Sequence, residues 1–264
     1  MGQIVKIQAI GLLFSIMISA CISDRVQFKE SEMVAVDDDC DLYVFYPKYT
    51  DIEFKIGKIP DLSDHSVVFC CGAAFTRNRR FNVDSSNVAG PYVSNGSYHA
   101  GYPCVFNTSV FAYYDNVWHF ASDSIGVYMD EAVSSEGMAF CQIPIPLGLS
   151  MEIEPEDVYF SIGNYRFYKS RDGKFLFRRR NHKYRALCEK SGRLCVAQSQ
   201  TPCSYSEFCD RLKSYGISEA IYLDVGLGWS YGWYRLDDDS VQNLDKRVHP
   251  FVSNWLVFRN SSIP

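Results

Sequence analysis

The sequence predicts an α+β fold: a large mixed β-sheet with few helices, including one strand-helix-strand crossover near residues 193–223. Short segments rich in Val, Ile, Phe and Tyr recur along the chain, whereas only Tyr205–Tyr215 shows clear helical spacing. The 264 residues are 47% hydrophobic and 15% aromatic, which indicates a large folded core and excludes disorder as the main state. Two strands that flank a helix indicate a parallel crossover connection.

Residues 1–20 are predicted to be an export signal. Lys6 precedes the apolar stretch Ile7–Ile18, which is too short to span a bilayer. The junction Ile18-Ser-Ala-Cys21 resembles the lipobox of bacterial lipoproteins, in which the chain is cleaved before a Cys that is then acylated. The alternative is an ordinary secretory peptide with a chance Cys at its end. The expectation is therefore an exported protein of the cell envelope, held at the membrane by a lipid on Cys21.

The remaining chain divides into a polar, acidic tether at 21–40 and one domain at 41–264. Alternating or continuous apolar residues predict most of the strands, and Asp115-Asn116 is typical of a hairpin turn. The segment from Asn78 to Tyr102 is rich in Gly, Asn and Ser and is expected to be a long loop. The predicted strand regions are Leu42–Tyr46, Ile52–Ile56, His65–Phe75, Val105–Phe120, Met138–Ile145, Val158–Phe167 and Lys174–Arg178.

The helix at Tyr205–Tyr215 is the best-defined element. Ser204 and Glu207 have the spacing of a capping box, and Gly216 provides a left-handed stop. Predicted strands at Arg193–Gln198 and Ala220–Leu223 flank it, which completes the crossover.

The ten Cys residues do not form a recognisable metal or disulfide pattern. There is no CxxC motif and the five His residues are scattered, so a zinc cluster is disfavoured. Without Cys21 an odd number of Cys residues remains, so at least one is unpaired. Pairs such as Cys188 with Cys195 are close enough in sequence to be considered as disulfides. Most of the Cys residues have apolar neighbours, which favours buried free thiols.

The charge balance disfavours nucleic acid as a partner. Lys and Arg number 26 against 31 Asp and Glu, which gives a net charge of -5. The one basic run, Arg178–Lys183, is interpreted as a solvated surface segment. HExxH and P-loop motifs are absent from the sequence.

The segment Leu223–Arg235 is the strongest candidate for a site. Asp224 follows a predicted strand directly, and Gly226 and Gly228 would let backbone amides approach a ligand. Three aromatic residues that could stack on a sugar follow: Trp229, Tyr231 and Trp233. The alternative is a Gly-rich turn capped by Asp224, with the aromatic residues buried in the core.

Four segments resemble, in order and spacing, motifs of the phosphodiester glycosidase family, which includes the uncovering enzyme for mannose 6-phosphate tags. Arg185 matches the family's Arg, Asp224 its Asp, and Gly72 and Gly226 its motif glycines. The chain departs from the pattern at Cys71, Ala186 and the run from Val225 to Trp229, which replace Asn, Thr and a Gly-Gly-Gly-Ser run. The segments are Gly72–Phe75, Tyr184–Leu187, Tyr205–Tyr215 and Ala220–Asp224.

The resemblance implies a hydrolase that acts on a glycosyl phosphodiester or a related glycan. Arg185 would hold the phosphate and Asp224 would act as acid, base or charge stabiliser. The competing hypothesis is a non-catalytic glycan-binding or surface-scaffold lipoprotein on the same fold. The sequence assigns no cofactor to either and leaves a divalent cation open: Asp224 could be one of its ligands, but one carboxylate is not a metal site.

Overall fold

The computed structural model describes most of the predicted domain. The described residues are 28–76, 87–103, 108–145, 147, 158–162, 165–169, 175–178, 183–225, 231–245 and 252–262. The predicted export signal and Cys21 therefore lie outside the described residues. Among the helices that are described, none is both long and apolar enough to cross a membrane.

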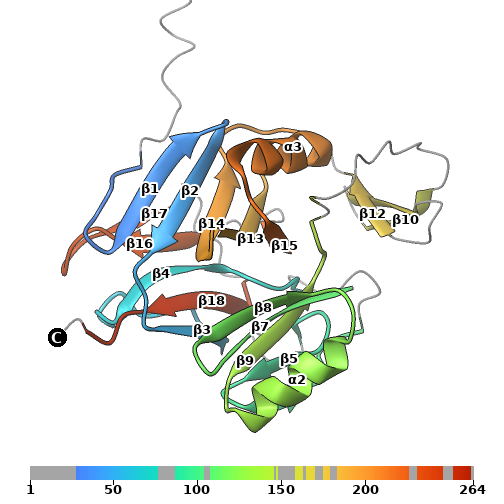
Figure 1. Cartoon of the computed structure of the whole chain (residues 1–264), viewed down its shortest axis with the longest axis horizontal. Helices are drawn as coiled ribbons and strands as arrows, with labels where there is room; N and C mark the ends of the chain where they lie inside the picture. Colours follow the sequence, from blue (N-terminus) through green and yellow to red (C-terminus); the bar gives the residue numbers. More distant parts are fainter. Residues whose placement is uncertain are drawn as a thin grey trace, which may run out of the picture.

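Three five-stranded antiparallel sheets make up the body of the molecule (Figure 1). The first sheet has the order β1 (Val34–Asp39), β2 (Leu42–Pro47), β14 (Arg193–Ser199), β13 (Arg185–Lys190), β15 (Glu219–Leu223). The middle sheet has the order β17 (Val241–Asn243), β16 (Gly232–Arg235), β4 (Val67–Gly72), β18 (Asn254–Arg259), β3 (Asp51–Ile56). The third sheet has the order β6 (Ser97–His99), β5 (Tyr92–Ser94), β9 (Met138–Gln142), β7 (Ser109–Tyr114), β8 (Val117–Ala121). A separate small sheet contains β10 (Val158–Ile162), β11 (Tyr165–Lys169) and β12 (Phe175–Arg178).

One face of the middle sheet contributes to an apolar core that joins all three sheets (Figure 1). Phe45 of the first sheet packs on Phe69 of the middle sheet, with ring centroids 5.7 Å apart. Phe54 of the middle sheet stacks on Phe140 of the third sheet at 5.2 Å. Helix α3 (Tyr205–Tyr215) covers the outer face of the first sheet, and helix α2 (Ile125–Ser134) covers the outer face of the third sheet.

The predicted α+β class with a parallel crossover is wrong, because every pairing in these sheets is antiparallel and the fold is mostly β. Strands β14 and β15 do not pair with each other: β13 lies between them and is antiparallel to both. The two-residue turn Ser191-Gly192, with φ of 52° and 74°, folds β13 back on β14. The predicted crossover required β15 to pair with β14, but β13 occupies that edge of β14. Helix α3 therefore connects β14 to a strand on the far side of β13.

Other local predictions are confirmed. Helix α3 spans Tyr205–Tyr215, both hydrogen bonds of the capping box are present, and Gly216 has φ 86°. Strand β4 is buried along its whole length, as its apolar run predicts. Asp115 and Asn116 form a hairpin turn with φ of 51° and 61°.

Two elements lie where the sequence interpretation had no regular structure. Helix α2 was missed because it has no side-chain cap at Ser124 and buries only Met129 and Ala132, so its apolar periodicity is weak. Hairpin β5–β6 falls within the segment expected to be a long loop, and β1 falls within the predicted tether.

The prediction of buried thiols is confirmed for most Cys residues that the structure describes. All the Cys residues that the structure describes are free thiols without a disulfide, and all except Cys40 are buried. Cys188 and Cys195 face each other on β13 and β14 as free thiols. The buried ones are Cys70, Cys71, Cys141, Cys188, Cys195, Cys203 and Cys209.

The capping box gives a direct test of how much α3 contributes to stability. Ser204 accepts a hydrogen bond from the Glu207 backbone N–H at 3.2 Å, so Ser204→Ala leaves that donor without its partner. We expect the free energy of unfolding in urea to fall by about 1 kcal/mol. Ser206→Ala, at an exposed position in the same turn, is the matched control and should change it by less than about 0.5 kcal/mol. Equal losses in the two variants would contradict the role of the cap.

Candidate functional site

Arg185 and Asp224 approach the end of β4 and the residues that follow it, Cys71–Thr76, which we call the β4 exit segment and which includes Gly72. The segment leaves the middle sheet inside the molecule, and every residue in it except Phe75 is buried. A buried segment outside a regular strand has backbone groups that need partners other than a neighbouring strand. Side chains from the first, middle and third sheets supply several of them.

Asp224 is one of these side chains. It follows β15 directly, its backbone N–H donates to the carbonyl of Ala73 at 2.9 Å, and it is 2% exposed. Its Oδ2 accepts a hydrogen bond from the backbone N–H of Thr76 at 3.3 Å. The end of β15 therefore places a carboxylate against the β4 exit segment.

Asn254, the first residue of β18, contributes the closest set of contacts. Its Oδ1 accepts from the Ala74 backbone N–H at 2.7 Å, and its Nδ2 donates to the Ala74 carbonyl at 3.0 Å. The neighbouring Ser253 hydroxyl lies 3.0 Å from the Thr76 hydroxyl, and Gln142 Nε2 donates to the Ala73 carbonyl at 3.4 Å. All of these side chains are buried, so they fix the path of the segment.

Arg185, the first residue of β13, approaches the other end of the segment. Its guanidinium is fully buried, and Nε and Nη2 donate to Gln198 Oε1 at 3.0 and 2.5 Å. Burial lowers the pKa of Arg185, while the adjacent Cys71 and Asp245 act in the opposite direction. Burial also raises the pKa of the Cys71 thiol to about 11 despite the nearby guanidinium. Cys71 is therefore a neutral thiol near pH 7 and not a nucleophile.

The structure thus brings Arg185 and Asp224 to the two ends of one short segment. Arg185 on β13 is paired with Leu223 on β15, and Asp224 is the next residue after Leu223. Gly72 lies between Cys71, which is next to the Arg185 guanidinium, and Ala73, whose carbonyl accepts the backbone N–H of Asp224. Chemically, the arrangement offers a cation and a carboxylate in a water-poor environment, where electrostatic effects are strong.

The aromatic residues after Asp224 are placed differently. Trp233 has no exposed surface and packs against Cys70, Trp255 and Val257 on the outer face of the middle sheet. Tyr231 is half-buried, with its ring edge-on to Trp255 at 6.0 Å. The other predicted ligand-binding residues, Gly226, Gly228 and Trp229, lie outside the described residues.

Sequence reasoning missed the polar residues that hold the β4 exit segment. Asn254 begins a mostly apolar strand and follows Ser253, and Gln142 ends an apolar strand. A buried position for a polar residue requires a hydrogen-bond partner, but the sequence does not show which residue will supply it. No group of three or more His, Cys, Asp or Glu side chains suited to a metal occurs among the residues placed by the structure.

Comparison with known proteins gives a distant similarity in overall structure. No protein-family model matches the chain, and no curated protein matches it. Among solved structures, it is similar to the catalytic domain of zebrafish N-acetylglucosamine-1-phosphodiester alpha-N-acetylglucosaminidase, auto-inhibited by its pro-peptide. The sequences are 9% identical, the match covers 86% of this chain and 81% of that chain, and the TM-score is 0.49.

Asn254 provides a test of what holds the β4 exit segment in place. Asn254→Ala removes the partners of both the N–H and the carbonyl of Ala74, which are buried. We expect a loss of roughly 2 to 4 kcal/mol in the free energy of unfolding, measured in urea. Asn243→Ala, at an exposed position in β17, should have almost no effect. A loss below about 1 kcal/mol for Asn254→Ala would mean that the segment finds other partners.

Proposed function

We propose that the chain is a hydrolase that acts on a glycosyl phosphodiester or a related glycan at the β4 exit segment. One observation carries the proposal: Arg185 begins β13, Asp224 directly follows the neighbouring strand β15, and both approach the same six-residue segment. Hydrolysis of such a substrate requires a positive charge for the phosphate and a carboxyl group beside the scissile bond. Both groups are present here.

In this proposal Asp224 is the catalytic residue and Arg185 is a positioning residue. Asp224 would donate a proton to the leaving oxygen or take one from the attacking water. Two of the guanidinium nitrogens of Arg185 are hydrogen-bonded to Gln198. Arg185 therefore acts through its positive charge, which a low-dielectric environment transmits well, and not through a bidentate contact with the phosphate.

The second candidate is a non-catalytic glycan-binding or surface-scaffold protein on the same fold. The observation that favours it is burial: Arg185 is 0% and Asp224 is 2% exposed, and both have internal hydrogen bonds. A substrate would have to displace these contacts before it could reach Asp224, whereas a binding protein would use its surface and leave the two residues as internal supports.

We also propose that the protein is exported and anchored to the membrane by a lipid on Cys21. This proposal rests on the sequence Ile18-Ser-Ala-Cys21 and the apolar stretch before it. A lipid at the N-terminus of the mature chain would hold the domain at a membrane surface, and so place it beside envelope glycans.

Asp224→Asn tests the catalytic proposal. The wild type should release reducing sugar from a sugar-1-phosphate aryl diester, and the variant should be at least about 100-fold slower because the amide cannot transfer the proton. Asp239→Asn, which removes an exposed carboxylate after β16, should keep the wild-type rate. Equal rates for Asp224→Asn and wild type would contradict the role of Asp224. Glycan binding by the wild type without any turnover would select the second candidate.

Cys21→Ser tests the anchor. Cells expressing the wild-type chain with radiolabelled palmitate should give a labelled protein in the membrane fraction, and Cys21→Ser should abolish the label. Cys40→Ser is the matched control, because Cys40 is a partly exposed thiol in the same N-terminal region, and it should keep the label. Unchanged labelling of Cys21→Ser, or an unlabelled wild type, would rule the anchor out.

A further inference from the structure

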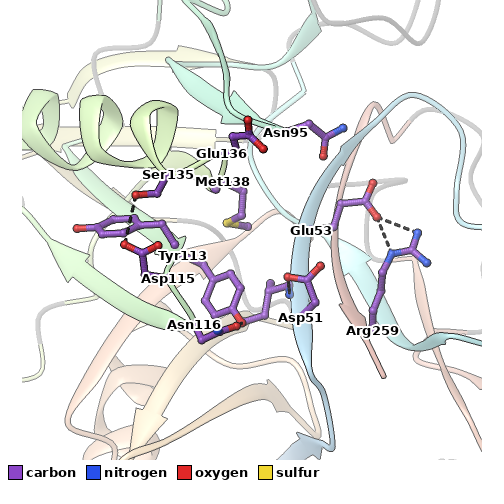
Figure 2. Close-up of a pocket in the computed structure, with 13 residues that line it drawn as sticks. Asp51, Glu53, Asn95, Tyr113, Asp115, Asn116, Ser135, Glu136, Met138 and Arg259 are labelled. Atoms are coloured by element: carbon purple, nitrogen blue, oxygen red, sulfur yellow. Dashed lines mark hydrogen bonds and ion pairs between the residues drawn. The ribbon is translucent and has the colours of Figure 1, made fainter. Parts of the chain in front are cut away.

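A second polar site lies far from the β4 exit segment, in a cavity between the edge of the middle sheet and the third sheet (Figure 2). Its volume is about 480 Å³, which is within the range of small-ligand sites. It lies beside Arg259, at the opposite end of β18 from Asn254. Five residues of extended strand separate the two positions by roughly 17 Å.

The cavity is formed where edge strand β3 meets three turns of the third sheet. The Ser94 hydroxyl donates to the Phe54 carbonyl at 2.7 Å, which joins β5 to the free edge of β3. The β5–β6 turn is joined to the end of α2 by the Gly96 N–H, which donates to the Gly137 carbonyl at 3.0 Å. These contacts hold the walls in place without a ligand.

Its lining combines an apolar floor with a ring of carboxylates. Tyr113 and Met138 are 6% and 3% exposed and belong to the central core, and their side chains lie in the middle of the view in Figure 2. The Tyr113 hydroxyl lies 3.3 Å from Asn116 Oδ1, and burial together with the Asp51 carboxylate raises its pKa. The carboxylates around this floor are those of Asp51, Glu53, Asp115 and Glu136.

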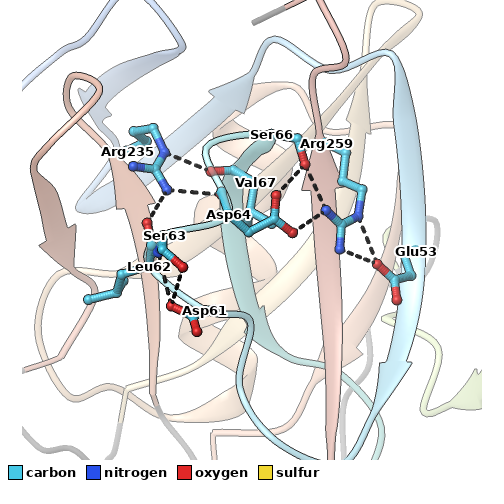
Figure 3. A network of polar contacts seen from close by, with 9 residues as sticks. All are labelled: Glu53, Asp61, Leu62, Ser63, Asp64, Ser66, Val67, Arg235 and Arg259. Atoms are coloured by element: carbon cyan, nitrogen blue, oxygen red, sulfur yellow. Dashed lines mark hydrogen bonds and ion pairs between the residues drawn. The ribbon is translucent and has the colours of Figure 1, made fainter. Parts of the chain in front are cut away.

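The charges in the cavity are not balanced by the protein. Arg259, the one cationic residue in the lining, donates to Glu53 at 2.8 Å and to Asp64 at 2.7 Å, so its charge is already compensated (Figure 3). In the described parts of the chain, no Lys, Arg or His side chain forms an ion pair with Asp51, Asp115 or Glu136. Anions are therefore repelled from the cavity and cations are attracted.

The spacing of the carboxylates indicates the kind of cation. No three of the acidic groups that the structure places come close enough to form a metal site, so the charges surround the cavity instead of meeting at one point. A compact metal ion could not satisfy them together, whereas an extended aliphatic cation could reach several at once. Its methylene groups would pack on Tyr113 and Met138, and ammonium groups also interact favourably with a tyrosine ring.

We propose that this cavity binds an aliphatic compound with two or more ammonium groups, through the carboxylates of Asp51, Asp115 and Glu136. The same chemistry is offered by a free polyamine and by the lysine side chains of a polypeptide. Neither the β4 exit segment nor the proposed hydrolysis takes part in this site.

Isothermal titration of the purified chain with spermidine at low ionic strength tests the proposal, and an N-acetylated trilysine amide is the second probe. The wild type should bind at least one of the two. The double variant Asp115→Asn/Glu136→Gln should bind about tenfold more weakly, because it loses two ion pairs with the ligand. Both positions are exposed, and each replacement has nearly the same shape as the native residue, so folding should be retained.

The matched control is Asp130→Asn/Glu219→Gln, which removes two exposed carboxylates outside the cavity. It should bind as the wild type does. Binding of spermidine alone would assign a free polyamine, and binding of the peptide alone would assign lysine side chains; either supports the site. The proposal is overturned if neither probe binds at millimolar concentration, or if the control loses as much affinity as the cavity variant. The single variant Glu136→Gln, expected to bind about threefold more weakly, keeps the test decisive if the double variant does not fold.

Discussion

The complete burial of β4 is the constraint on which the rest of the structure depends. One face of this strand contributes Phe69 and Cys71 to the core shared by the three large sheets, and the other contributes Val67 and Cys70 to the apolar layer that contains Trp233. The strand also ends inside the molecule, since Gly72 and most of the residues that follow it are buried. Its last residues and the segment after them therefore cannot take hydrogen bonds from bulk water. The buried amide of Asn254, the carboxylate of Asp224 and the amide of Gln142 meet this requirement, and they make the β4 exit segment polar inside an apolar environment. The need to provide hydrogen bonds for this buried backbone therefore gathers polar side chains at the β4 exit segment, where we propose that hydrolysis takes place.

Among the arginines that the structure describes, Arg185, Arg235 and Arg259 show different ways to compensate a charge, and the differences bear on function. Arg235 is 1% exposed and donates to the carbonyls of Leu62, Asp64 and Val67, so it ties the loop before β4 to β16 (Figure 3). Arg259 is compensated by two carboxylates. Arg185 has a neutral amide, Gln198, and a neutral thiol, Cys71, as its close partners. The Asp245 carboxylate also acts on this guanidinium and offsets part of the cost of its burial. A buried cation of this kind can stabilise an anion that approaches it.

Local features of the fold could be predicted from the sequence, and the order of the strands could not. Helix α3 carries all its signals within thirteen residues, from Ser204 to Gly216, and β4 carries its own in a continuous apolar run. The first sheet depends instead on Ser191-Gly192, where two left-handed residues turn β13 back along β14. That turn decides which strand edge remains free, and β15 then has to pair with β13. At the site, Asp224 was accessible to sequence reasoning because it ends a strand beside glycines. Asn254 could not be identified in this way, because its role is to hydrogen-bond the backbone of Ala74, which is 180 residues away in the sequence.

The two polar regions differ in a way that separates their roles. At the β4 exit segment, Asp224 and Asn254 are almost fully buried and are bonded to backbone groups of the protein itself, so the polar groups there stabilise the fold whether or not a ligand is present. In the cavity beside β3, the carboxylates of Asp115 and Glu136 are exposed, and removal of either one should cost the fold little. Substitutions at the first region therefore alter stability together with activity, and only near-isosteric changes such as Asp224→Asn can separate the two. Substitutions at the second region should alter binding far more than stability, because the one hydrogen bond given for these two carboxylates, from the Ser135 hydroxyl to Asp115 at 3.3 Å, is exposed to water.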